Sequence, residues 1–204
     1  MGTENNQENM QTYLEDLQTI KSLLIKVENT PLIEKWVFIT WGIFILIGTI
    51  LHLILSDYGH LSLHDLGLKL WLPVILIGGV LEAIGWFQAL GKESLTLSSP
   101  RVYKFYINFI GTAVCLVLLG ILITRLGGVR YLGVVILFSM AIIFFNFSLT
   151  GAYTRLTQFG IGFLLGGILL LIFHPPVLVN FLVTGLVTGI SMLLAGLLKS
   201  HRGQ

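Results

Sequence analysis

A single acidic residue, Glu82, interrupts the long apolar run LIGGVLEAIGWFQAL. If this run crosses a bilayer, a carboxylate inside it is costly and marks a functional site by default. Trp86 lies four residues further along and shares the face of Glu82 on a helix. Two interpretations stay open: a proton- or cation-coupled site, and a structural hydrogen bond between helices.

Four polar residues in later apolar runs are candidates to accompany this site. By their depth in the runs, Thr112, Thr188 and Ser191 are the expected partners of Glu82. Asn146 lies near the end of its own run, where an amide favours hydrogen bonding between helices over a place in an ion pathway.

A second polar group lies between the first two apolar runs, in the segment HLILSDYGHLSLHDLG. His60 and His64 are four residues apart and Asp57 is close by, and imidazole with carboxylate suits Zn²⁺ or another transition metal. The same side chains could respond to acid, or the segment could be a solvated loop without a ligand.

No motif in the sequence points to catalysis. A nucleophile elbow, a phosphate-binding glycine loop, an HExxH motif and paired carboxylates are all missing from it. We therefore expect no cofactor and no enzymatic activity.

Apolar helices must position these groups. Of the 204 residues, 55% are hydrophobic and 11% are charged, whereas soluble domains carry about 25% charged residues. A helix needs about 20 predominantly apolar residues to cross a bilayer. The sequence predicts an all-α membrane domain over residues 31–204, with six spans at 36–55, 70–90, 105–124, 131–149, 159–173 and 177–198.

Proline and glycine refine this prediction at its C-terminal end. Pro175 and Pro176 follow His174, and because proline cannot continue a helix, they predict a tight hairpin between a short fifth span and the sixth. Gly185 and Gly189 form a G-x-x-x-G pair in the sixth span. Such a pair favours close packing within the chain, with a dimer seam as the alternative.

Lys and Arg residues predict the orientation of the chain, because cytoplasmic loops carry the excess of both. With both termini in the cytoplasm, the outer side holds only Lys69, Arg125 and Arg130. No acidic residue follows Glu93, but the basic residues there are too widely spread for a nucleic-acid-binding surface. The lipid bilayer is therefore the expected partner of this domain.

Residues 1–30 differ from the rest of the chain. They are polar and net acidic and do not resemble a signal peptide, so we expect the first span to act as its own insertion signal. Within them, apolar residues recur at alternating spacings of three and four, which predicts a cytoplasmic heptad helix. This seam comprises Met10, Tyr13, Leu17, Ile20, Leu24 and Val27.

Several partners for this helix stay open. An interfacial helix on the bilayer usually has a basic polar face, whereas this segment is acidic, so docking to a protein is favoured. The partner would be a second copy, another protein, or the basic cytoplasmic loop near Arg101 and Lys104.

Three stretches resemble an uncharacterised family of small bacterial six-span membrane proteins, often encoded beside a winged-helix regulator: YLEDLQTIKSLLIKVE, SPRVYKFYINFIGTAVCLVLLGIL and NFSLTGAYTRLTQFGIGFLLGGILLLIF. The hairpin GILLLIFHPPVLVNFLVTGLVTG is also similar to those of HdeD-type acid-resistance membrane proteins. The resemblance implies a multi-pass protein of the bacterial inner membrane and implies no particular activity.

Two functions are favoured by these features, and a membrane enzyme that uses the histidine segment is a third alternative. The first is a non-enzymatic regulatory, scaffold or stress-response component that associates through residues 10–28. The alternative is a small proton- or cation-linked transporter or channel that uses Glu82.

Overall fold

A computed structural model describes residues 13–22, 33–57, 59, 61–92, 100–125, 128–150 and 155–198 of the chain. The chain divides into two compact units, Met1–Thr30 and Pro31–Gln204, which are described separately here. Within the described residues all regular secondary structure is helical, and there is no strand.

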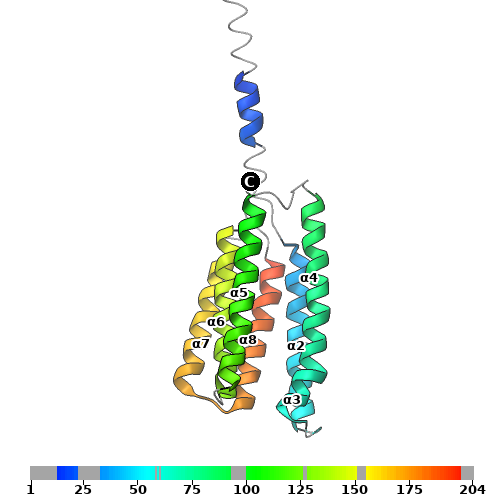
Figure 1. Cartoon of the computed structure of the whole chain (residues 1–204), viewed down its shortest axis with the longest axis vertical. Coiled ribbons are helices and arrows are strands. Elements are labelled where there is room, and N and C mark those ends of the chain that lie inside the picture. The colour runs from blue at the N-terminus through cyan, green and yellow to red at the C-terminus, as the bar shows by residue number, and fades with distance from the viewer. Residues whose placement is uncertain are drawn as a thin grey trace, which may run out of the picture. The chain divides into compact units, whose positions relative to one another are not determined.

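The second unit is a bundle of long apolar helices (Figure 1). Their order is α2 (Lys35–Asp57), α3 (Leu63–Leu66), the π-helical turn η1 (Gly67–Trp71), α4 (Leu72–Lys92), α5 (Pro100–Arg125), the short turn η2 (Val129–Tyr131), α6 (Leu132–Thr150), α7 (Leu156–Phe173) and α8 (Val177–Leu197).

Five of these helical segments are long and apolar enough to cross a membrane: Lys35–Asp57, Leu63–Ala89, Val129–Leu149, Leu156–Phe173 and Val177–Leu197. Their outer faces carry large exposed apolar side chains, such as Ile47, Val80 and Phe87, which suit contact with lipid rather than water. These properties are consistent with a multi-pass membrane protein.

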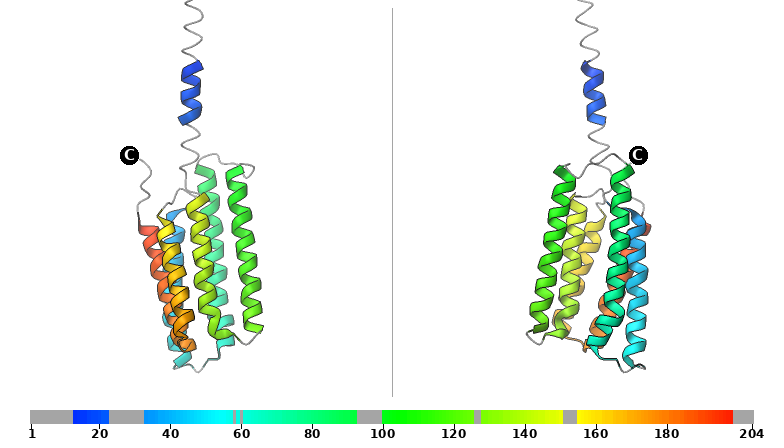
Figure 2. Two further views of the ribbon diagram at one scale, coloured as in Figure 1. Left: turned by 90° about the vertical axis from the view of Figure 1, so that its left-hand side faces the viewer. Right: turned by 45° about the vertical axis from the view of Figure 1, so that its right-hand side comes forward.

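The helices form two groups joined by α8. One group packs α2 against both α8 and α4, and the other packs α6 against both α7 and α5. Figure 2 shows α4 beside α2 in one group, and α5, α6 and α7 in the other. Because α8 also contacts α6 and α7, it connects the two groups.

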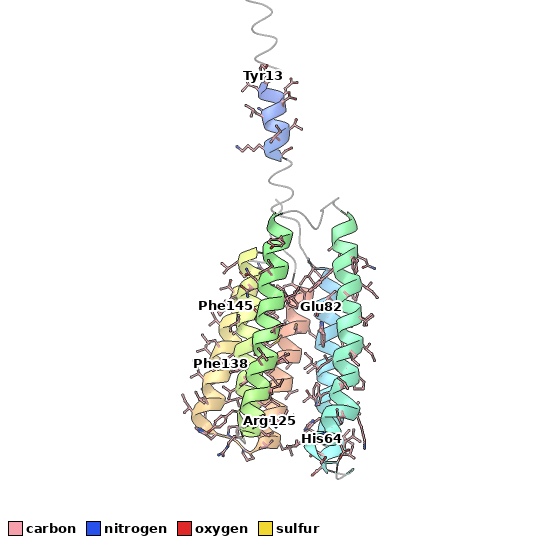
Figure 3. The ribbon with its side chains drawn as sticks, in the orientation of Figure 1. Tyr13, His64, Glu82, Arg125, Phe138 and Phe145 are labelled. Carbon is pink, nitrogen blue, oxygen red and sulfur yellow. The ribbon has the colours of Figure 1, made fainter. Side chains whose placement is uncertain are left out.

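Phenylalanine rings fill the core between the two groups. Phe144 lies 5.0 Å from Phe163 and 6.1 Å from Phe38, measured between ring centroids and with the rings edge to face. Two further rings of α6 pack onto glycines of α7: a Cβ on Gly160 would lie 2.8 Å from the Phe145 ring, and one on Gly167 would lie 2.6 Å from Phe138. Figure 3 shows Phe138 and Phe145 of α6 on the side of the bundle where α7 packs.

The glycine pair of the last span packs inside the chain. A Cβ on Gly189 would lie 2.6 Å from the Leu46 side chain of α2, and a Cβ on Gly185 would collide with Thr49. Gly42 faces α8 from the other side of the same contact, where a Cβ would lie 2.7 Å from the Leu193 backbone. The expectation of close packing within the chain is confirmed.

The bounds of two predicted spans need correction. The fifth span is an 18-residue helix rather than a short one, because it begins at Leu156 instead of residue 159. The second begins at Leu63 rather than at residue 70, since Gly67 has helical dihedral angles (φ −58°, ψ −49°) and the chain continues through η1 into α4.

The break between the last two helices lies where the sequence predicts it. Helix α7 ends at Phe173, His174 adopts a left-handed conformation (φ 44°), and α8 begins at Val177 after the two prolines. The two helices are therefore separate spans. However, α8 makes its most extensive contact with α2 rather than with its hairpin partner α7.

Candidate functional site

Three tryptophans form hydrogen bonds along the contact between α2 and the helix that starts at Leu63. The Trp41 Nε1–H group donates to Glu82 Oε2 at 3.0 Å, and the Trp36 Nε1–H group donates to Gln88 Oε1 at 3.3 Å. Towards the other end, Trp71 Nε1–H donates to Nδ1 of His52 at 3.0 Å.

Each of these indole rings also packs near a glycine on the facing helix. A Cβ on Gly78 would lie 2.5 Å from the Trp41 ring, and a Cβ on Gly48 would lie 3.2 Å from the Trp71 ring. Trp36 approaches Gly85 in the same way, at 3.3 Å. In each case the polar acceptor follows the glycine by three or four residues, so glycine and acceptor share one face of the helix.

Glu82 lies on the α4 side of this contact and borders a cavity of about 190 Å³. Figure 3 places its side chain between α4 and the neighbouring helices. The cavity lies where α2, α4, α5, α6 and α8 meet, and its lining is apolar apart from the Glu82 carboxyl and the Trp41 indole. The lining residues are Ile33, Val37, Phe38, Trp41, Ile45, Glu82, Phe109, Met140, Ile143, Phe147 and Met192.

The hydrogen-bond partner of Glu82 differs from the residues expected from the sequence. Thr112 accepts a hydrogen bond from Asn146 Nδ2 at 3.3 Å, and the Thr188 hydroxyl has no partner among the described residues. Ser191 is partly buried on α8. Depth in a span does not predict which helix faces meet, and an indole N–H group, as on Trp41, is as able to donate to a carboxyl as the hydroxyl groups expected from the sequence.

The other intramembrane candidates serve packing between helices. The Asn146–Thr112 hydrogen bond connects α6 to α5, which is the interhelical role expected for this amide. Trp86 packs edge to face on Phe109 of α5, with ring centroids 5.0 Å apart. It lies on the same helix as Glu82 but does not line the Glu82 cavity.

The histidine segment between α2 and α4 has a different form from the loop expected there. Ser62 caps the helix: its hydroxyl accepts from the Asp65 backbone N–H at 3.1 Å and donates to the Asp65 carboxylate at 2.6 Å. Asp65 also pairs with Lys69 at 3.1 Å, and His64 is exposed.

The metal site expected from the sequence stays a prediction. His60 lies outside the described residues, and Asp57 is at the end of α2. Among the described residues there is no group of three or more His, Cys, Asp or Glu side chains arranged to hold a metal ion.

His52 is close to the histidine segment in the sequence, but its position in the structure is different from that of the metal site expected there. It is 3% exposed, accepts the hydrogen bond from Trp71, and stacks on Phe181 of α8 with ring centroids 5.1 Å apart. It borders a further cavity of about 300 Å³. Ile45 lines both this cavity and the Glu82 cavity, so one side chain lies between them.

No family model, curated protein or solved structure matches the chain. The family resemblance of the sequence therefore stays a prediction. The fold is that of a helical protein with five helical segments apolar enough to cross a membrane, which is consistent with a multi-pass membrane protein. Cavities lie beside Glu82 and beside His52 among the described residues.

Proposed function

We propose that the chain is a six-span protein of the bacterial inner membrane with both termini in the cytoplasm. Helix α5, which contains the apolar stretch Ile107–Ile121, would supply the sixth span. The α2–α3, α5–η2 and α7–α8 connections lie at one end of the bundle in Figure 1. The excess of Lys and Arg in the other connections supports assigning this end to the outer side of the membrane.

Reporter fusions test this topology. Green fluorescent protein fused to the C-terminus should fluoresce, because it matures in the cytoplasm, and alkaline phosphatase fused after Gly128 should be active outside. A dark C-terminal fusion in cells that contain the full-length protein would contradict a cytoplasmic C-terminus.

Within this topology, we propose a non-enzymatic regulatory, scaffold or stress-response component that assembles through its N-terminal helix. The observation that carries this proposal is the apolar stripe on the helix at residues 13–22. Tyr13, Leu17 and Ile20 are 70%, 61% and 53% exposed. They lie three and four residues apart and so face one way. Met10, Leu24 and Val27, the other seam positions, lie outside the described residues.

Heptad positions favour a second copy of the chain as the partner. With Leu17 at position a and Ile20 at position d, the seam has the pattern that favours trimers and tetramers over dimers. Asp16 then falls at g and Lys21 at the following e, so the two residues attract each other between parallel copies. Such a short coiled coil is marginal alone, but membrane domains held in one bilayer raise its effective concentration.

The size of the assembly tests this function. Full-length protein should cross-link and appear in native mass spectrometry as an oligomer of more than two chains. A Leu17→Ser/Ile20→Ser variant should be smaller, whereas a Gln18→Ser/Ser22→Ala control, altered away from the seam, should keep its size. If the seam variant has the wild-type size, the proposal is wrong.

A second candidate function is proton- or cation-linked transport through Glu82, favoured by the cavity at this carboxyl. A carboxylate in apolar surroundings needs a hydrogen-bond donor or a positive charge, and a proton or cation entering the cavity would supply that charge. Glu82→Gln keeps an acceptor oxygen for Trp41 and should abolish flux of protons or cations in proteoliposomes at unchanged expression. Wild-type vesicles without flux of protons, Na⁺ or K⁺ would exclude this function.

A further inference from the structure

The Glu82 cavity, of about 190 Å³, combines one acidic side chain with aromatic walls. Trp41 of α2 and Phe109 of α5 both line it, and like Glu82 both are only partly buried, so all three keep surface that a molecule in the cavity can contact. Phe147 also lines the cavity and stacks on Phe109, with ring centroids 5.9 Å apart. The face of an aromatic ring attracts a cation within about 6 Å of its centre. The cavity therefore offers a carboxyl group and aromatic rings to one bound group.

One oxygen of the Glu82 carboxyl is open. Oε2 accepts the hydrogen bond from Trp41 at 3.0 Å. Oε1 has no hydrogen-bond partner among the described residues but, unlike the Thr188 hydroxyl oxygen, it is not fully enclosed. None of the described Lys or Arg residues forms an ion pair with this carboxyl, and no Lys, Arg or His lines the cavity. A carboxylate here thus has no counter-charge from the described part of the chain.

The composition of the lining selects the kind of cation. Mg²⁺ and Ca²⁺ require about six to eight oxygen ligands, whereas Glu82 supplies the only side-chain oxygens of this lining. A quaternary ammonium ion needs no oxygen ligands, because alkyl groups surround its charge and contact apolar and aromatic walls. An uncharged ligand would leave the carboxylate without a counter-charge, which is costly in apolar surroundings. The lining therefore favours an organic cation over a metal ion or a neutral molecule.

The volume of the cavity limits the size of this cation. Small-molecule sites usually measure about 300–1,000 Å³, so a cavity of about 190 Å³ is small. An apolar cavity of about 150 Å³ holds one benzene molecule. The Glu82 cavity therefore has room for a trimethylammonium group that carries at most one ring.

We propose that the Glu82 cavity binds one small quaternary ammonium ion, with its charge beside the Glu82 carboxylate and its methyl groups against Trp41 and Phe109. The proposal deepens the second candidate function by naming the cation, and it rests on that function's use of Glu82 as a cation site. The hydrogen bond from Trp41 holds the carboxyl at the cavity wall. Apolar side chains of the lining, such as Met140 and Ile143, contact the rest of the ion.

Equilibrium dialysis of the full-length protein in detergent tests this binding. Radiolabelled phenyltrimethylammonium should bind saturably at one ion per chain, beyond its binding to protein-free micelles. tert-Butylbenzene has the same shape without the charge and should not displace the ion at equal free concentration. If the ion does not bind saturably, or if tert-butylbenzene displaces it as well as the unlabelled ion does, the proposal is wrong.

Glu82→Gln tests the role of the charge. The amide keeps the shape of the side chain and an acceptor oxygen for Trp41, and we expect the affinity for phenyltrimethylammonium to fall by at least about tenfold. Glu15→Gln makes the same chemical change at an exposed position of the N-terminal helix and should bind the ion as the wild type does. Wild-type affinity in Glu82→Gln would place the ion elsewhere and overturn the proposal.

Phe109→Leu tests the aromatic wall. It replaces the ring with an aliphatic side chain and should weaken binding by about three- to tenfold. Phe87→Leu is the control, because Phe87 is 71% exposed on α4 and is outside the lining. Far-UV circular dichroism identifies any variant that fails to fold, and the comparison with tert-butylbenzene on the wild type decides the proposal without variants. Wild-type affinity in a folded Phe109→Leu variant would contradict the aromatic contact.

Binding and transport are measured separately. If phenyltrimethylammonium binds in a Glu82-dependent way but vesicles show no flux, the site is supported and the transport function is wrong. If vesicles show Glu82-dependent flux of protons, Na⁺ or K⁺ but the ion does not bind, the transport function is supported and the quaternary ammonium site is wrong.

Discussion

Trp41 of α2 donates its indole N–H to the carboxyl of Glu82 on α4 across 3.0 Å, and its ring packs on Gly78 one turn before that acid. The same arrangement of ring, glycine and acceptor recurs at Trp71, Gly48 and His52, with the helices exchanging roles. A glycine lets the bulky ring approach the helix, and the polar side chain satisfies the indole nitrogen that burial would otherwise leave unpaired. The acid thus has a structural contact as well as a place in a cavity.

Trp41→Phe should destabilise the bundle by about 1–3 kcal/mol, because it removes the hydrogen bond and leaves the Glu82 oxygen without its donor. Glu82→Gln should cost less, since the amide oxygen still accepts from Trp41. Thermal unfolding in detergent, followed by far-UV circular dichroism, measures both. Equal losses for the two variants would show that the bond contributes little.

Trp36→Phe should have a smaller effect than Trp41→Phe. Its acceptor, Gln88, is exposed, and the hydrogen bond is longer at 3.3 Å, so competing donors can replace the indole. The same unfolding measurement ranks the two substitutions, and a larger loss for Trp36→Phe would contradict this account of the contact.

Gly185→Ala should destabilise the chain by about 1–3 kcal/mol, because the added methyl group collides with Thr49 and separates α2 from α8. Gly162→Ala on α7 is the matched control, since its Cβ would meet nothing within 4 Å and alanine favours helix. The difference in melting temperature between the two variants measures the contact. An unfolding temperature unchanged by Gly185→Ala would mean that the two helices adjust at no cost.

Asp16→Lys should weaken the oligomer, since it opposes like charges between position g and position e of neighbouring copies. We expect the protein concentration needed for half-assembly to rise by roughly tenfold. The double variant Asp16→Lys/Lys21→Asp should restore assembly, whereas Glu15→Lys, at the outward f position, should have little effect. Cross-linking yield against concentration provides the readout. If the double variant does not regain assembly, the proposed pairing of Asp16 with Lys21 between parallel copies is wrong.

Ser62→Ala should cost about 1 kcal/mol, because Ser62 caps the helix that begins at Leu63 by accepting from the Asp65 backbone N–H. The local consequence is fraying of the helix start, which faster amide hydrogen exchange at residues 63–66 would report. Ser62→Asp keeps a capping oxygen and is the control. Protection in Ser62→Ala equal to that in the wild type would show that the cap is dispensable.

The sequence alone determined which segments are helical and apolar and where the chain must break. Length and hydropathy are properties of a segment by itself, so the separate helices on either side of His174-Pro175-Pro176 were predictable. Glu82 was equally visible, because a lone acid in an apolar run needs no structure to be noticed. Two glycines four residues apart predicted a close helix contact in the same way.

Only the tertiary structure decided which faces meet. Every span of this chain is apolar on most sides, so its sequence does not fix the rotation of one helix against the next, and the bond of Glu82 to Trp41 could not be chosen over the hydroxyl groups of Thr112 and Thr188. The position of His52 could not be predicted for the same reason. In the sequence it is a histidine near the end of the first apolar run. In the bundle it is buried against Trp71 and Phe181 beside a cavity, and because Nδ1 accepts from Trp71, the neutral ring has its proton on Nε2.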